Sequence, residues 1–157
     1  YASRIAETRF SRLSEEERGK AESIVRILES SDDVGAIEKN TALAQMGALF
    51  SKTDAYDPVA CEPVGLELQA DVFQAVWKEA AGLRRIGKLQ ELGKRIECPV
   101  VAIHGDFDPH PAEGVSRPLS AVLKSFRFIL LESCGHSPWT ERMAKETFYE
   151  ILEEELK

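Results

Sequence analysis

Two short apolar runs near the carboxyl end of the chain are each followed by a polar turn. Pro99 to Ile103 reads PVVAI and runs into the turn 105–109, GDFDP, while Phe126 to Leu131 reads FRFILL and runs into the turn 133–138, SCGHSP. Apolar, β-branched-rich runs of this length, bounded by turn residues, predict buried strands. Between them, Ala112 to Lys124 has apolar positions at roughly helical intervals and predicts a helix.

A strand, a helix and a second strand in this order form a parallel, right-handed unit. The turns that leave the two strands therefore lie at the same edge of the sheet, where open α/β sheets bind their ligands. We expect Asp108 and His136 to lie within hydrogen-bond reach there, with Asp106 as the alternative carboxylate of the same turn. A carboxylate beside an imidazole fixes the tautomer of the ring and leaves its other nitrogen free to act as a base. The pattern thus predicts Asp108 as a catalytic acid and His136 as its base.

The remaining periodicity is helical, and it divides the chain into an all-helical region, 1–95, and a strand-containing region, 96–157. Ser14 and Glu17 form a capping-box pattern at the start of the second helix. The predicted helices are Ala2 to Leu13, Ser14 to about Ser30, Val34 to Ser51, Leu66 to Ile96 with a break near Gly82 or Gly87, and a closing helix from Glu141 to Leu156. Residues 30–33 are expected to end the second helix and cap the third, and 53–65 to form a loop.

Several apolar side chains recur at helical spacing and are expected to face inward. These are Ile37, Leu43, Met46 and Phe50 in the third helix, Leu68, Val72, Phe73, Val76 and Trp77 in the fourth, and Met143, Phe148, Ile151 and Leu152 in the closing helix. A helical block that precedes a strand, helix, strand unit fits a cap that lies over the edge of a sheet.

Composition narrows the classes of function. The 157 residues carry a net charge of -7 and a sequence pI near 5.1, which argues against nucleic acid or an anionic membrane as the main partner. No apolar run approaches the length of a membrane span. The three cysteines, Cys61, Cys98 and Cys134, show no Cys-x-x-Cys spacing, so neither a disulfide framework nor a zinc site is indicated. This profile is typical of a cytoplasmic protein.

Three other residues near the two turns have competing interpretations. His104 ends a strand and is expected to be structural, whereas His110 follows the aspartate turn closely enough to line a pocket, without an assigned chemical role. Cys134 precedes the histidine turn and could be a nucleophile, but a structural role is the stronger interpretation.

The two turns resemble those of a known family. Gly105-x-x-Asp108-x-x-Pro111, followed by Cys134-Gly135-His136-x-Pro138-Trp139-x-Glu141, is similar to the carboxy-terminal part of an α/β-hydrolase of the proline-iminopeptidase branch. The resemblance implies an α/β fold in which the acid follows the next-to-last strand and the histidine the last. It also implies hydrolysis of an ester or amide bond, possibly an amino-terminal peptide bond, in a small-molecule or peptide substrate. No metal or organic cofactor is implied.

One part of the family pattern is missing. The chain has no Gly-x-Ser-x-Gly nucleophile motif, so we expect it to be a carboxy-terminal fragment that is inactive without an amino-terminal half. The strand Pro99 to Ile103 would then have a bare edge, which favours self-association or coverage by the missing half. Two alternatives remain open: a non-catalytic binding or assembly module with this fold, and a hydrolase with an aspartate nucleophile, as in dehalogenase-like relatives.

Overall fold

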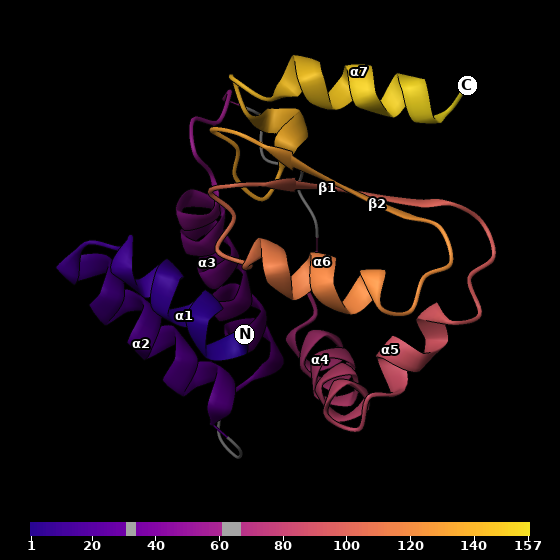
Figure 1. The fold of residues 1–157 in the computed structure, drawn as a ribbon. Helices are drawn as coiled ribbons and strands as arrows, with labels where there is room; N and C mark the ends of the chain where they lie inside the picture. The colour runs from indigo at the N-terminus through magenta and orange to yellow at the C-terminus, as the bar shows by residue number, and fades with distance from the viewer. Residues whose placement is uncertain (31–33, 61–66) are drawn as a thin grey trace.

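The computed structural model describes residues 1–30, 34–60 and 67–157 of a mixed α/β protein. Ser30 ends α2 as predicted, whereas the rest of the predicted 30–33 cap, Cys61 and part of the predicted 53–65 loop lie outside the described residues. Three helices open the chain and two more precede the strands (Figure 1). In order, the elements are α1 (Ala2–Ser11), α2 (Glu15–Glu29), α3 (Ala36–Asp54), α4 (Ala70–Arg85), α5 (Lys88–Gly93), β1 (Val100–Gly105), α6 (Ala112–Ser120), β2 (Phe126–Leu131), the short 3₁₀ helix η1 (Pro138–Thr140) and α7 (Lys145–Glu155).

The strand, helix, strand unit is confirmed. β1 and β2 pair in parallel from Val100 opposite Phe126 to Gly105 opposite Leu131, and α6 connects them. Helices α6 and α7 lie on opposite faces of this sheet (Figure 1). The expectation that both strands are buried was wrong, because within the described residues the sheet has only two strands and most of their side chains are partly exposed. Burial is complete only at the carboxyl ends, next to the two turns.

The first three helices form their own apolar core. Leu13, Ala21, Ile24, Ala42 and Met46 are buried together there. The predicted capping box is present, since the Ser14 hydroxyl accepts from the Glu17 backbone N–H while the Glu17 carboxylate accepts from the Ser14 N–H. Helix α3 continues three residues beyond the predicted Ser51, to Asp54, and this extra turn brings its carboxyl end to the sheet edge.

In the third and closing helices, Ile37 and Met143 were predicted to face inward, and both predictions were wrong. Ile37 is 84% exposed because it lies in the first turn of α3, away from the three-helix core. Met143 is 65% exposed because the closing helix begins at Lys145 rather than at Glu141. The residues before Lys145 instead form the 3₁₀ helix η1 and a turn that buries the Glu141 side chain.

The fourth predicted helix is broken at Gly87, one of the two glycines expected there. Gly87 has φ +75°, a left-handed conformation that glycine adopts without steric cost, whereas Gly82 lies inside α4. Contrary to expectation, the apolar face of α4 is open to solvent: Val72, Phe73, Val76 and Trp77 are each about half exposed.

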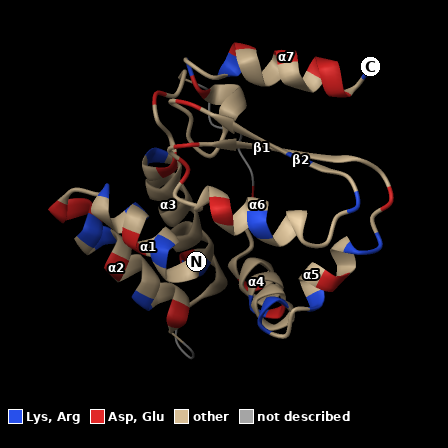
Figure 2. Cartoon of the chain, in the orientation of Figure 1, with Lys and Arg blue, Asp and Glu red and all other residues tan. Residues whose placement is uncertain are grey.

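Charged residues of both signs lie on the helices, while the strands carry few charges (Figure 2). Helix α7 is the most one-sided, since only its first residue is basic and acidic residues follow along its length. Within the described parts of the chain, no helix combines the length and apolarity needed to cross a bilayer.

Candidate active site

The two turns that leave the strands are tied together by their backbones. The N–H of Asp106 donates to the Leu131 carbonyl at 2.9 Å, and the N–H of Phe107 donates to the Cys134 carbonyl at 2.9 Å. A side chain at Gly105 would collide with the Cys134 backbone, so only glycine allows this close approach. The aspartate turn and the histidine turn are therefore held against one another at the carboxyl edge of the sheet.

This arrangement brings Asp108 and His136 together, as the sequence predicts. Nδ1 of His136 lies 2.7 Å from Oδ2 of Asp108, although the residues are 28 positions apart. The Asp108 side chain is 4% exposed and that of His136 is 53% exposed. The alternative carboxylate, Asp106, instead accepts from the Cys134 backbone N–H at 3.2 Å and has a structural role.

The contact between Asp108 and His136 shifts the pKa of both side chains. Burial alone would raise the pKa of Asp108, but hydrogen bonds from His110 and His136 outweigh it and hold that pKa well below its usual range. The hydrogen bond to Asp108 raises the pKa of His136, and the nearby Asp108 charge adds to this increase against the effect of burial. The pair therefore favours a carboxylate beside an imidazolium.

Sequence reasoning missed a second imidazole on the same carboxylate. Nδ1 of His110 lies 2.7 Å from Oδ1 of Asp108, and the His110 backbone N–H donates to the same oxygen at 2.8 Å. The His110 and His136 rings stack with centroids 4.9 Å apart and planes inclined by 29°. The spacing Asp-x-His in a turn was the available signal, because a residue two positions after an aspartate can place its N–H on that carboxylate.

His104 lies behind this cluster. Its side chain is buried, its Nε2 lies 2.9 Å from the His110 carbonyl oxygen, and its Nδ1 is 3.8 Å from Oδ2 of Asp108. These contacts are consistent with the structural role expected for this residue.

Asp108, His110 and His136 could also be considered as metal ligands, since their ligand atoms lie within 4.8 Å of one another. Two ligands of a tetrahedral zinc ion are ~3.3 Å apart when each lies about 2.0 Å from the metal. Here each imidazole Nδ1 lies 2.7 Å from a carboxylate oxygen, the length of a charge-assisted hydrogen bond. The geometry fits a proton-bearing network rather than a metal cage.

The Glu141 side chain holds the histidine turn in place through hydrogen bonds to backbone N–H groups. Its side chain is fully buried, and its two oxygens accept backbone N–H groups of Tyr56 at 2.8 Å, Asp57 at 2.8 Å and Gly135 at 3.0 Å. The sequence analysis placed Glu141 at the start of the closing helix and in the motif of the histidine turn without giving it a role. Nothing in local periodicity distinguishes a buried glutamate from an exposed one. Because these donors come from two distant segments, Glu141 joins the histidine turn to the chain that follows α3.

The end of α3 contacts the same turn. The Asp54 carbonyl accepts the His136 backbone N–H at 2.8 Å. The Asp54 carboxylate receives Nε and Nη2 of Arg9 from α1, at 2.8 Å and 2.5 Å, and neither side chain is more than slightly exposed. The all-helical region therefore supports the backbone of His136 directly.

Arg12 provides a second link between α1 and the aspartate turn. Its guanidinium donates to the carbonyls of Thr53 at 2.7 Å and Phe107 at 2.8 Å, and lies 3.6 Å from the centre of the Phe107 ring. Burial lowers the pKa of Arg12, but it remains a cation at neutral pH, and its charge lies near Asp54 and Asp108.

Cys134 does not fit the role of nucleophile. Its side chain is fully buried, and its Sγ lies 3.4 Å from the neighbouring Gly135 carbonyl. Burial raises the pKa of the thiol to about 11, with a further increase from the charge of Glu141. At neutral pH the reactive thiolate is therefore scarcely present.

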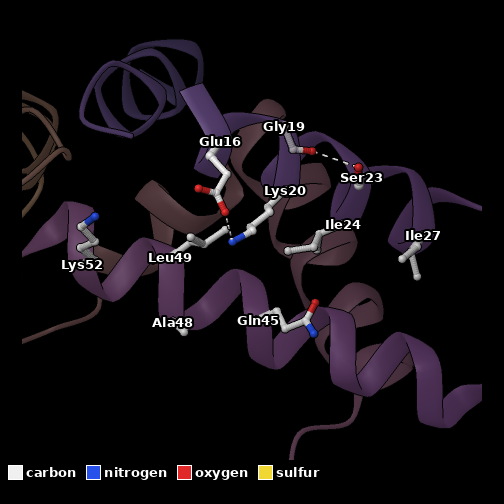
Figure 3. A pocket seen from close by; sticks show the side chains of 10 residues that line it. All are labelled: Glu16, Gly19, Lys20, Ser23, Ile24, Ile27, Gln45, Ala48, Leu49 and Lys52. Carbon is white, nitrogen blue, oxygen red and sulfur yellow. Dashed lines mark hydrogen bonds and ion pairs between the residues drawn. The ribbon is translucent and has the colours of Figure 1, made fainter. Parts of the chain in front are cut away.

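An open groove of the described residues lies away from the two turns. It is an open depression of about 810 Å³ between α2 and α3, lined by Ile24, Ile27 and Leu49 together with an ion pair of Glu16 and Lys20 (Figure 3). None of the residues at the aspartate or histidine turn lines it. The two turns instead form a surface cluster at the sheet edge.

Comparison with known proteins assigns no family. No protein-family model matches the chain, and no significantly similar curated protein or solved structure was found.

Proposed function

We propose that Asp108 and His136 are the acid and the base of a serine-type α/β-hydrolase that cleaves an ester or amide bond. The observation that carries this proposal is the 2.7 Å contact between Asp108 Oδ2 and His136 Nδ1 at the carboxyl edge of parallel strands. A carboxylate only accepts hydrogen bonds, so Nδ1 carries the proton and Nε2 is left as the basic nitrogen. The half-exposed ring can present that nitrogen to a substrate.

The chemistry follows from this orientation. His136 takes the proton of a serine hydroxyl as the hydroxyl oxygen attacks the carbonyl carbon, and Asp108 stabilises the resulting imidazolium. The imidazolium then gives the proton to the leaving group, and an acyl-enzyme remains. Water, deprotonated by the same imidazole, attacks the acyl carbon. The imidazolium then returns this proton to the serine oxygen as the bond to the acid product breaks. No step in this sequence uses a metal or organic cofactor.

The serine must come from residues outside the 157, because no Gly-x-Ser-x-Gly motif occurs among them. A sheet continued by another segment is consistent with β1, whose outer edge has no partner strand within 1–30, 34–60 and 67–157. In this proposal the chain is the cap and carboxy-terminal part of the enzyme and is inactive alone. The resemblance to the proline-iminopeptidase branch favours a small-molecule or peptide substrate, and the unpaired Cys98 and Cys134 favour the cytoplasm.

The test is covalent labelling of the protein encoded by the whole reading frame with a fluorophosphonate, followed by peptide mapping. We expect one labelled serine in a Gly-x-Ser-x-Gly motif, and a loss of labelling rate of roughly 10³-fold or more in His136→Gln. Glu150→Gln, which changes an exposed glutamate of α7, is the matched control and should label normally. Normal labelling of His136→Gln would contradict the proposed base.

The second candidate is a non-catalytic binding or assembly module with the same fold, and the missing nucleophile motif is the observation that favours it. A reading frame without that motif, together with no labelled serine, would support the module. An alkyl-enzyme adduct on an aspartate, detected by mass spectrometry with a haloalkane, would instead indicate the aspartate-nucleophile alternative.

A further inference from the structure

One carboxylate is shared by two imidazoles in the candidate site. Oδ2 of Asp108 accepts from Nδ1 of His136, while Oδ1 accepts from both Nδ1 and the backbone N–H of His110. An acid and base alone need only the first of these contacts. The second imidazole therefore has no role in the proposed mechanism as it stands.

Sharing the carboxylate constrains the protons on both rings. Since a carboxylate cannot donate, each neutral ring must carry its proton on Nδ1. When His110 donates, it draws charge from Asp108 that would otherwise stabilise the His136 cation. When both rings are protonated, two stacked cations 4.9 Å apart repel one another across one anion. Both effects oppose protonation of His136.

Other charged groups near the cluster come from each element packed against it. Asp54 at the end of α3 favours the His136 cation and Arg9 of α1 opposes it. Arg12, the residue that follows α1, lies near Asp108, and His104 of β1 has its Nδ1 3.8 Å from the same carboxylate. Among these groups only His110 shares the carboxylate with His136 through a direct hydrogen bond and also stacks on its ring.

We propose that His110 is a positioning residue that competes with His136 for Asp108 and thereby weakens the stabilisation that this carboxylate gives to the His136 cation. A base exchanges protons most readily when its cation is stabilised only moderately, and sharing the carboxylate moderates that stabilisation. This inference rests on the proposed roles of Asp108 and His136, but it can be tested on the 157-residue chain without a nucleophile.

The experiment is a pH titration of the imidazole Cε1–Hε1 signals by NMR. The chain has three histidines, so single substitutions assign each signal. In His110→Phe, which keeps a stacked ring but removes the donor and the second cation, we expect the pKa of His136 to rise by roughly half a unit or more. If His110 only supported the turn, its loss would free His136 from Asp108, and the pKa of His136 would fall towards the value of a free imidazole, about 6.5.

A second variant covers disruption of the turn by the larger phenylalanine. His110→Asn keeps an amide donor but cannot become a cation, so the pKa of His136 should again rise, by less than in His110→Phe. The His104 signal reports an intact turn, because its Nε2 lies 2.9 Å from the His110 carbonyl. An unchanged or lowered pKa of His136 in folded variants of both kinds would overturn the inference.

Asp108→Asn separates this inference from the proposed function. If Asp108 is the partner of His136, the pKa of His136 falls in this variant. If it does not fall, the proposed acid and base are wrong, whatever the His110 variants show. If it falls while the His110 variants produce no increase, the acid and base stand and only the role of His110 is rejected.

Discussion

Two buried carboxylates lie close to the histidine turn, and their partners differ in kind. The Asp108 carboxylate, 4% exposed, is bonded by two imidazoles and one backbone N–H, whereas the fully buried Glu141 carboxylate is bonded by three backbone N–H groups. Backbone donors cannot lose their protons, so Glu141 has a fixed environment and fixes geometry. The imidazole donors of Asp108 can exchange protons, and this property allows chemistry.

The largest expected effect comes from removal of the Glu141 carboxylate. Glu141→Ala leaves three backbone N–H groups without a buried acceptor, and we expect the free energy of unfolding to fall by about 3 kcal/mol. Urea denaturation monitored by circular dichroism measures this change. Glu150→Ala, at an exposed position of α7, removes the same side chain and should change the value by less than about 0.5 kcal/mol. Equal losses in the two variants would contradict the structural role of Glu141.

A smaller effect tests how closely the histidine turn packs on its support. A Cβ at Gly135 would collide with the Asp54 carbonyl oxygen and with Oε1 of Glu141. Gly135→Ala must displace this turn, so we expect a loss of about 2 kcal/mol of unfolding free energy. The same denaturation measurement applies.

The matched control is Gly82→Ala in α4, where a Cβ would meet no atom within 4 Å. Replacement of a glycine inside a helix by alanine stabilises by roughly 0.5–1 kcal/mol, so this variant should change in the opposite direction. A neutral or stabilising effect of Gly135→Ala would contradict the close contact between the histidine turn and the end of α3.

The difference between the carboxylates also explains what the sequence could and could not predict. The strand, helix, strand unit and the contact of Asp108 with His136 follow from local apolar runs and from the geometry of parallel strands. Glu141 could not be recognised because its donors, at Tyr56 and Asp57, are more than 80 positions away. The closing helix begins at Lys145 rather than at the predicted Glu141 for the same reason, since the long-range burial of Glu141 overrides its local helical pattern.

The apolar face of α4 shows the opposite case, in which side chains predicted to be buried are exposed. Helical spacing predicted that Val76 and Trp77 face inward, yet they are 58% and 51% exposed. Periodicity identifies an apolar face but not the surface that covers it. The hydrogen bond of His110 to Asp108 was also not predicted. A histidine in a turn has several possible local partners, and the sequence alone does not show which of them the fold selects.

The smallest expected effect is the pH dependence of the stability that the pair of Asp108 and His136 contributes. The pKa of Asp108 is lowered in the folded state, so its contribution to stability is present above its unfolded pKa of about 3.9 and is lost as the pH falls through the folded value. The pKa of His136 is raised, so its contribution is complete below about 6.5 and is lost as the pH rises through the folded value. The pair therefore stabilises the fold most between about pH 4 and 6.5.

The measurement is the difference in unfolding free energy between the wild-type chain and His136→Gln across this range. Because the His136 side chain is 53% exposed, solvent screening limits the difference to less than about 1 kcal/mol. We expect a plateau between about pH 4 and 6.5 and a decline on either side. A difference that instead increases above about pH 6.5 would mean that the folded state prefers the neutral imidazole, and the ion pair with Asp108 would be rejected.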